Sequence, residues 1–240
     1  YFDVAPSYGD AEERLGPALE PFRKDVFLAC KTNRRDKKGA AAALRESLKK
    51  LRTEHFDLYQ LHGLTTMEEV DQVLGSNGAL EAVLEARKAG LVRFVGFSAH
   101  SEEAALRVMD SFDFDSVLFP FNFVTYYTGN FGPEVLKKAT EKGVARLALK
   151  TLARSPYSEG SDRSQYPKCW YQPILDPIER NLALRWTLSL NITAAIPPGH
   201  AELFSPAVDI AENFQPLTDS ELAEVKKQAA TIEPLFKSEL

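Results

Sequence analysis

Three stretches that are expected to form strands end in polar residues able to hold a charge or move a proton. The opening stretch ends at Asp3, the second apolar stretch ends at Lys31, and the third leads into His62. Tyr8 lies five residues after Asp3, in a turn rich in Pro, Ser and Gly. A carboxylate, an ammonium, an imidazole and a phenol together can carry out general acid–base chemistry on a small molecule.

These side chains can act together only if their strands bring them to one edge of a sheet. Neighbouring strands lie about 4.8 Å apart, and α/β folds collect their chemistry at the carboxyl ends of parallel strands. Side chains alternate between the two faces of a strand. Lys31 therefore shares a face with Phe27 and Ala29, and His62 shares one with Leu58 and Gln60. The pattern allows the polar ends to converge on one interior.

Each of the four residues also has an ordinary structural explanation. Asp3 can cap the turn that follows it, and Tyr8 can pack on a loop. Lys31 can be solvated at the end of its strand, and His62 can be a hydrogen-bonded histidine without a role in chemistry. The structural explanation suits any one of them taken singly, but the joint placement at three successive strand ends favours a site.

The elements that position these residues alternate between strand and helix along the whole chain. After the opening strand, strands are expected at 26–31, 55–61, 91–98, 116–121, 144–149 and 191–196. Helices are expected at 10–19, 38–52, 66–90 with a break at 75–78, 101–111, 133–142, 175–190, 201–214 and 218–231. Strict alternation predicts a parallel sheet. No Gly-x-Gly-x-x-Gly follows any strand, and polar residues at successive strand ends suit the mouth of a barrel better than the crevice of a doubly wound sheet. The connection 150–173 has the length of a lid or binding loop.

Length and composition are typical of one folded domain with a small-molecule function. A chain of 240 residues with 44% hydrophobic content can bury a full core, so we expect a single domain over 1–240. The net charge of −5 comes from interspersed charges of both signs, which argues against a nucleic-acid surface. No apolar run reaches the ~20 residues of a membrane span. Two cysteines give neither a disulfide framework nor a metal motif, and we expect a reducing, cytoplasmic location and no metal.

The order and spacing of several motifs closely resemble the aldo-keto reductase family. The motifs are Phe2-Asp3-Val4-Ala5-Pro6-Ser7-Tyr8-Gly9, Ala29-Cys30-Lys31, Leu58-Tyr59-Gln60-Leu61-His62-Gly63, Val92-Arg93-Phe94-Val95-Gly96-Phe97-Ser98, Leu149-Lys150-Thr151-Leu152-Ala153-Arg154, Ala183-Leu184-Arg185-Trp186 and Ile196-Pro197-Pro198-Gly199. Each segment alone is weak, but the ordered set covers nearly the whole chain. The resemblance implies a (β/α)8 TIM barrel and the NAD(P)H-dependent reduction of an aldehyde or ketone to an alcohol.

By this resemblance, Asp3, Tyr8, Lys31 and His62 form the catalytic tetrad. Hydride goes to the carbonyl carbon, and Tyr8 protonates the oxygen. A phenol with its ordinary pKa of about 10 is a poor donor at neutral pH, and a nearby lysine ammonium lowers that pKa. Asp3 would hold Lys31 charged, and His62 would hydrogen-bond the carbonyl oxygen.

The resemblance also implies residues that hold the cofactor, NADP with NAD as the alternative. Ser98 matches the hydroxyl that contacts the nicotinamide carboxamide, although Ala99 replaces the asparagine that usually follows. Lys150, Leu152 and Arg154 match a stretch under the pyrophosphate, although Thr151 replaces the usual proline; a plain strand exit is the alternative. Gly199 and His200 begin a helix whose N-terminus can bind an anion. The family usually has basic residues here, whereas this chain has no Lys or Arg between Gly199 and Lys226.

Two further expectations remain open at this point. A second class of function is a catalytically weak or inactive relative that binds a nucleotide as a regulator, because a fold does not fix a function. The chain also starts at what is the second strand of the family's barrel, which gives seven β/α units, so we expect the first strand–helix unit to be absent. An open barrel wall between the first and last strands and a poor catalyst would follow from that absence.

Overall fold

The computed structural model describes residues 1–239 and divides into two compact units, Tyr1–Val117 and Leu118–Leu240. The expectation of one domain over 1–240 stays a prediction. In both units strands alternate with helices along the chain, as the sequence predicts.

Four parallel strands make up the sheet of the first unit. They are β1 (Phe2–Asp3), β2 (Leu28–Thr32), β3 (Phe56–Leu64) and β4 (Val92–Ala99), and they pair in chain order. Every residue of β2 is buried, and so are most residues of β3. Parallel strands that are covered on both faces are expected to consist mainly of buried, apolar residues. A buried polar residue in these strands therefore needs a specific partner.

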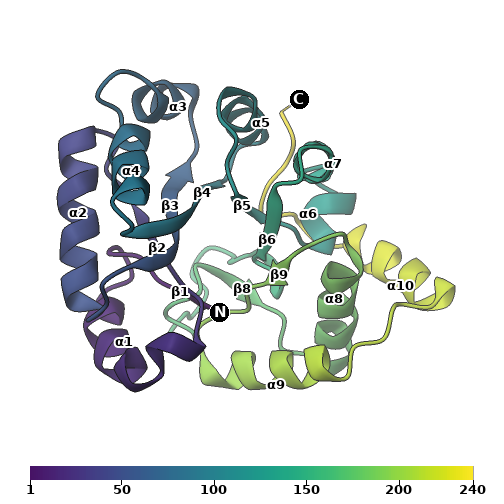
Figure 1. The fold of residues 1–240 in the computed structure, drawn as a ribbon. Helices are drawn as coiled ribbons and strands as arrows, with labels where there is room; N and C mark the ends of the chain where they lie inside the picture. The colour runs from purple at the N-terminus through teal and green to yellow at the C-terminus, as the bar shows by residue number, and fades with distance from the viewer. Residues whose placement is uncertain (240) are drawn as a thin grey trace. The chain divides into compact units, whose positions relative to one another are not determined.

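Helices and one 3-10 turn connect the strands of the first unit. They are α1 (Ala11–Leu19), η1 (Glu20–Asp25), α2 (Lys37–Lys50), α3 (Met67–Leu74), α4 (Ala79–Lys88) and α5 (Glu102–Ser111). Side chains of Asp36, Thr66 and Ser101 cap the N-termini of α2, α3 and α5. Helices α2 and α4 run side by side along the outer face of the strands (Figure 1).

One glycine explains how closely α1 approaches α2. A Cβ atom on Gly16 would lie 2.2 Å from the backbone oxygen of Lys50. Only a residue without a side chain fits there, so Gly16 lets α1 pack against the end of α2.

The second unit contains the strands β5 (Ser116–Pro120), which begins in the first unit, β6 (Ala145–Leu149) and β9 (Ala194–Ala195), in that order. Its helices are α6 (Phe123–Tyr127), α7 (Pro133–Glu141), α8 (Pro177–Ser189), α9 (Ala201–Glu212) and α10 (Asp219–Ala229). Strands β6 and β9 are parallel. Trp186 of α8 lies in a core cluster with Phe123 and Val225, which joins α6, α8 and α10 (Figure 1).

Two features of the second unit differ from the sequence-based expectation. The connection 150–173 contains an antiparallel pair, β7 (Ala153–Pro156) and β8 (Tyr171–Pro173), and is therefore partly a hairpin. Helix α6 was not expected. Asn122 accepts a hydrogen bond from the Thr125 backbone N–H and begins it.

Both cysteines are free and buried. Burial, together with the nearby charge of Glu12, raises the pKa of the Cys30 thiol to about 12, so this group stays protonated at neutral pH.

Over residues 1–239, no group of three or more His, Cys, Asp or Glu side chains is arranged to hold a metal ion. None of the helices in that range has the length and apolar character needed to cross a bilayer.

Candidate active site

Asp3 and Lys31 form a buried ion pair at the ends of β1 and β2. Lys31 is fully buried, and its Nζ atom contacts Asp3 Oδ2. Burial alone lowers the pKa of an ammonium, but attraction to Asp3 and Tyr8 outweighs it and raises the pKa of Lys31 above its ordinary value of 10.5. Lys31 is therefore a cation at neutral pH.

Tyr8 is brought to this pair by a tight turn. Its backbone N–H donates to Ala5 O at 3.0 Å, with Pro6 in the second position of the turn, where proline is favoured. Gly9 follows with φ +63°, a conformation that glycine adopts without strain. Lys31 Nζ donates a hydrogen bond to Tyr8 Oη at 3.2 Å. Tyr8 remains 45% exposed, although Lys31, which contacts its hydroxyl, is fully buried.

His62 lies beside the Tyr8 ring. The two ring centroids are 5.7 Å apart and the rings are perpendicular. The Nδ1 atom of His62 is 2.7 Å from Asn33 Oδ1. Because the amide oxygen can only accept, Nδ1 is the donor in this contact. Asn33 thus fixes the ring orientation of His62.

The backbone around His62 is held by two further side chains. Arg35 donates to His62 O at 2.7 Å and to Gly63 O at 3.1 Å. The Gly63 N–H donates to Ser98 Oγ at 2.8 Å. The pairing of β3 with β4 is irregular between Leu61 and Leu64, as at a β-bulge, which can re-aim a side chain. Ser98 therefore contacts the strand end that carries His62, and its role toward a cofactor stays a prediction.

The structure brings Asp3, Tyr8, Lys31 and His62 together within the first unit. This is the convergence that the alternation of side chains along the strands predicts. It also adds Gln60, whose Nε2 donates to Asp3 Oδ1 at 3.0 Å. The arrangement places a phenol next to a buried cation and next to an imidazole, as general acid chemistry requires.

The predicted cofactor residues on the way into β7 have partners within the second unit. Lys150 has φ +64°, and its Nζ atom lies 5.1 Å from the ring centroid of Trp170. Leu152 is fully buried in a core cluster. Arg154 forms an ion pair with Glu179, with Nε and Oε1 3.0 Å apart. A role of Lys150, Leu152 and Arg154 under a pyrophosphate stays a prediction.

Gly199 and His200 lie directly before α9, as predicted. His200 is the N-cap residue, but its side chain does not cap the helix. Its Nε2 atom accepts a hydrogen bond from the Lys168 backbone N–H at 3.3 Å. The first N–H groups of α9 are thus left without a side-chain acceptor, which is the condition for binding an anion there.

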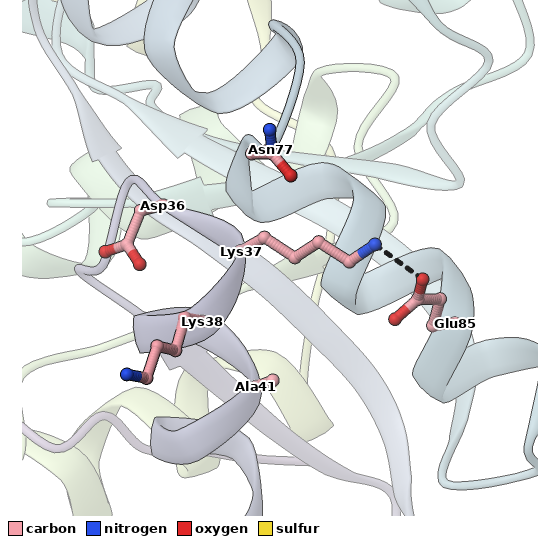
Figure 2. A pocket seen from close by; sticks show the side chains of 6 residues that line it. All are labelled: Asp36, Lys37, Lys38, Ala41, Asn77 and Glu85. Atoms are coloured by element: carbon pink, nitrogen blue, oxygen red, sulfur yellow. Dashed lines mark ion pairs between the residues drawn. The ribbon is translucent and has the colours of Figure 1, made fainter.

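A surface hollow of about 370 Å³ lies elsewhere in the first unit, beside the N-terminus of α2 (Figure 2). In Figure 2, Lys37 reaches along α4 to Glu85, and their charged atoms are 2.6 Å apart. Lys37 also pairs with Glu81. Because its charges are matched and none of Asp3, Tyr8, Lys31 and His62 lines it, we do not assign the active site to this hollow.

Comparison with known proteins identifies the family. The model of the aldo/keto reductase family matches residues 1–172, a range that includes Asp3, Tyr8, Lys31 and His62. The chain belongs to the aldo-keto reductase family. It is 33% identical over 113 residues to the uncharacterized oxidoreductase YqkF of Bacillus subtilis, a match covering 41% of this chain and 35% of the relative. It is also 33% identical over 97 residues to the methylglyoxal reductase DkgA of Salmonella typhimurium, covering 39% and 33%. The matched stretches span about a third of these relatives.

Solved structures of the family show the fold. An aldo-keto reductase of Klebsiella pneumoniae in complex with NADPH superposes with a TM-score of 0.71 at 20% identity, covering 99% of this chain and 82% of that chain. This likeness confirms the predicted fold, the α/β barrel of the aldo-keto reductases.

Sequence reasoning did not assign roles to Gln60 and Asn33 in this aldo-keto reductase. Gln60 carried one usable signal, since it is a polar residue between Tyr59 and Leu61 and lies two residues before His62 on the same face. Asn33 is an exposed loop residue, and the sequence alone offers no sign that it meets His62.

Proposed function

We propose that this aldo-keto reductase reduces the carbonyl group of a small aldehyde or ketone with NADPH, and that Tyr8 donates the proton. The observation that carries the proposal is the hydrogen bond from the buried, cationic Lys31 to Tyr8 Oη at 3.2 Å. Family membership supports it, as do the Salmonella relative named for methylglyoxal reduction and the Klebsiella complex with NADPH.

The proton transfer follows from the geometry around Tyr8. NADPH, when bound, supplies the hydride that the carbonyl carbon accepts. The Tyr8 O–H donates its proton to the carbonyl oxygen, and the phenolate that remains accepts the hydrogen bond from Lys31. A buried ammonium stabilises this phenolate more strongly than water would. Asp3 keeps Lys31 charged and directed toward Tyr8.

His62 is the residue we propose for orienting the substrate. Its ring lies edge to face with Tyr8, so a carbonyl oxygen hydrogen-bonded to Tyr8 Oη also comes near the imidazole. Since Nδ1 donates to Asn33, Nε2 can donate to the substrate when the ring carries both protons. His62 then aims the carbonyl oxygen at the Tyr8 hydroxyl.

The residues proposed for the cofactor fit a dinucleotide in part. The uncapped N–H groups after His200 suit a phosphate. The Ser98 hydroxyl is buried and already accepts from the Gly63 N–H, so it would have to turn to meet an amide. No cation lies in 199–225 for a 2′-phosphate. Lys150, Leu152 and Arg154 are the residues predicted to lie under the pyrophosphate. Of these, Arg154 would have to leave its ion pair with Glu179 to reach it. The cofactors to compare in the test are therefore NADPH and, as the alternative, NADH.

The test is a turnover assay combined with a binding assay. Purified protein is mixed with NADPH or NADH and a panel of aldehydes and ketones that includes methylglyoxal, and the loss of reduced cofactor is followed. Cofactor affinity is measured separately by the change in cofactor fluorescence. Turnover of at least one carbonyl substrate supports the proposal. Cofactor binding without turnover across the panel would contradict it and favour a nucleotide-binding regulator.

A further inference from the structure

Gln60 is a fully buried amide in the middle of β3. It is paired in register with Lys31 of the neighbouring strand. Its Nε2 atom donates to Asp3 Oδ1 at 3.0 Å, whereas its Oε1 atom has no hydrogen-bond partner in the described part of the chain. The buried Gln60 amide thus uses its donor in a hydrogen bond but not its acceptor.

Fold stability does not explain this glutamine. A buried acceptor without a partner costs free energy, whereas an apolar side chain of the same length would leave no such group. Its neighbours on β3, Tyr59 and Leu61, are fully buried. A strand of this type accepts methionine or leucine readily. The amide must therefore contribute through the group it contacts.

That group is the carboxylate of Asp3. The Gln60 amide and the Lys31 ammonium each bind a different oxygen of this carboxylate. Oδ2 contacts Lys31 Nζ, and Oδ1 accepts from Gln60. The other donor to Oδ1 is the Tyr1 hydroxyl, at the longer distance of 3.3 Å. Backbone bonds from Phe2 N–H to Phe27 O and from Val4 N–H to Ala29 O hold the main chain on either side of Asp3, but they do not set the rotation of its carboxylate. Gln60 fixes the rotation of the carboxylate so that Oδ2 stays on Lys31.

We propose that Gln60 is a positioning residue for Tyr8, acting through Asp3 and Lys31. The contacts run without interruption from Gln60 Nε2 to Asp3, from Asp3 to Lys31 Nζ, and from Lys31 Nζ to Tyr8 Oη. The inference rests on the proposed function, because it assigns to Gln60 the placement of the cation that stabilises the Tyr8 phenolate. Gln60 itself touches neither substrate nor cofactor in this role.

The test compares Gln60→Met and Gln60→Glu with a matched control. Gln228→Met is the control, because Gln228 of α10 also donates to a carboxylate, Glu224, and also has an unpartnered buried Oε1. We expect Gln60→Met to lower kcat about tenfold, with KM changed less than twofold and the thermal midpoint unchanged or raised. A glutamate can donate to Asp3 only when protonated, so Gln60→Glu should be impaired at neutral pH and recover as the pH falls. Gln228→Met should keep wild-type activity.

Two outcomes would overturn the inference: wild-type kcat in Gln60→Met, or a loss of kcat that only accompanies a lower thermal midpoint. A second readout does not depend on turnover. The Lys31 ammonium is titrated by NMR of its side-chain carbon, and its midpoint should fall in Gln60→Met because Asp3 is held less firmly. An unchanged midpoint contradicts the inference. If the wild-type protein shows no Tyr8-dependent turnover, the proposed function fails, and this titration still decides the role of Gln60.

Discussion

The ammonium nitrogen of Lys31 lies 3.2 Å from the phenolic oxygen of Tyr8, inside a strand that is buried at every position. A buried lysine needs a counter-charge, and Asp3 supplies it. The cation is thereby held in place before any substrate arrives. Electrostatic stabilisation of this kind is effective because the dipoles and charges need not rearrange during the reaction.

The Lys31–Asp3 pair allows catalysis and stability to be separated. Lys31→Met leaves the Asp3 carboxylate without its partner and should destabilise the protein by about 3–5 kcal/mol. It should also lower kcat by a factor on the order of 10²–10⁴. The double variant Lys31→Met/Asp3→Asn removes both charges and should recover most of the stability while kcat stays low. Urea unfolding and steady-state kinetics measure the two quantities. Recovery of kcat in the double variant would show that the pair is purely structural.

Asn33 should influence the reaction through the orientation of His62. Asn33→Ala removes the acceptor 2.7 Å from Nδ1, a hydrogen bond worth about 1 kcal/mol, which corresponds to a roughly fivefold lower kcat/KM. Asn33→Asp keeps an acceptor oxygen at the same position and should retain most of the activity. Steady-state kinetics on the preferred carbonyl substrate checks both variants. Equal kcat/KM in wild type and Asn33→Ala would exclude this role.

The fold around Asp3, Lys31 and His62 could be predicted because side-chain alternation in strands is regular. The end of β1 at Asp3 follows from it directly, while β2 runs one residue past Lys31 to Thr32 and β3 runs past the predicted 55–61 to Leu64. The predicted strand 191–196 is reduced to β9, Ala194–Ala195, although Ile196 N still donates to Ala148 O. Periodicity locates strands well, but their ends depend on which neighbours are available for pairing.

The remaining features depend on contacts between residues far apart in sequence. Strands β7 and β8 pair Pro156 with Tyr171 across a long connection, which local periodicity cannot reveal. Helix α6 consists of Phe, Val, Thr and Tyr residues, which favour strands intrinsically, and its cap and its packing against α10 override that preference. Gln60 and Asn33 acquire their roles only from partners on other strands and loops.

The acid stability of the first unit should depend on Glu69. Burial acts to raise the pKa of this carboxyl, but hydrogen bonds from Arg35 and Thr65 outweigh it and lower the pKa to about 2. The folded-state pKa of Glu69 is below its unfolded value of 4.5. The ionised carboxylate therefore contributes fully to the free energy of unfolding above pH 4.5, and this contribution is lost as the pH falls toward 2. Urea midpoints of wild type and Glu69→Gln should therefore converge over that range, with the exposed Glu68→Gln as control. Parallel curves for wild type and Glu69→Gln would contradict the assignment.

Cofactor preference should respond to a cation at the start of α9. Since 199–225 contains no Lys or Arg, we expect the wild-type protein to discriminate weakly between NADPH and NADH. His200→Lys adds a charge beside the uncapped N–H groups and should raise the ratio of kcat/KM for NADPH over NADH by about tenfold, equivalent to about 1.4 kcal/mol. His200→Gln adds no charge and serves as control. A ratio unchanged by the lysine would place the 2′-phosphate elsewhere.

The proton donor assignment to Tyr8 is tested most directly by a single-turnover reaction with NADPH deuterated at C4. In the wild-type protein, deuterium should appear on the carbinol carbon of the product. Tyr8→Phe should bind the cofactor with nearly unchanged affinity and transfer deuterium slower by a factor on the order of 10²–10⁴, because no acid protonates the oxygen. Tyr126→Phe, a tyrosine of α6 outside the site, should transfer it at the wild-type rate. Transfer by Tyr8→Phe at the wild-type rate would contradict the account.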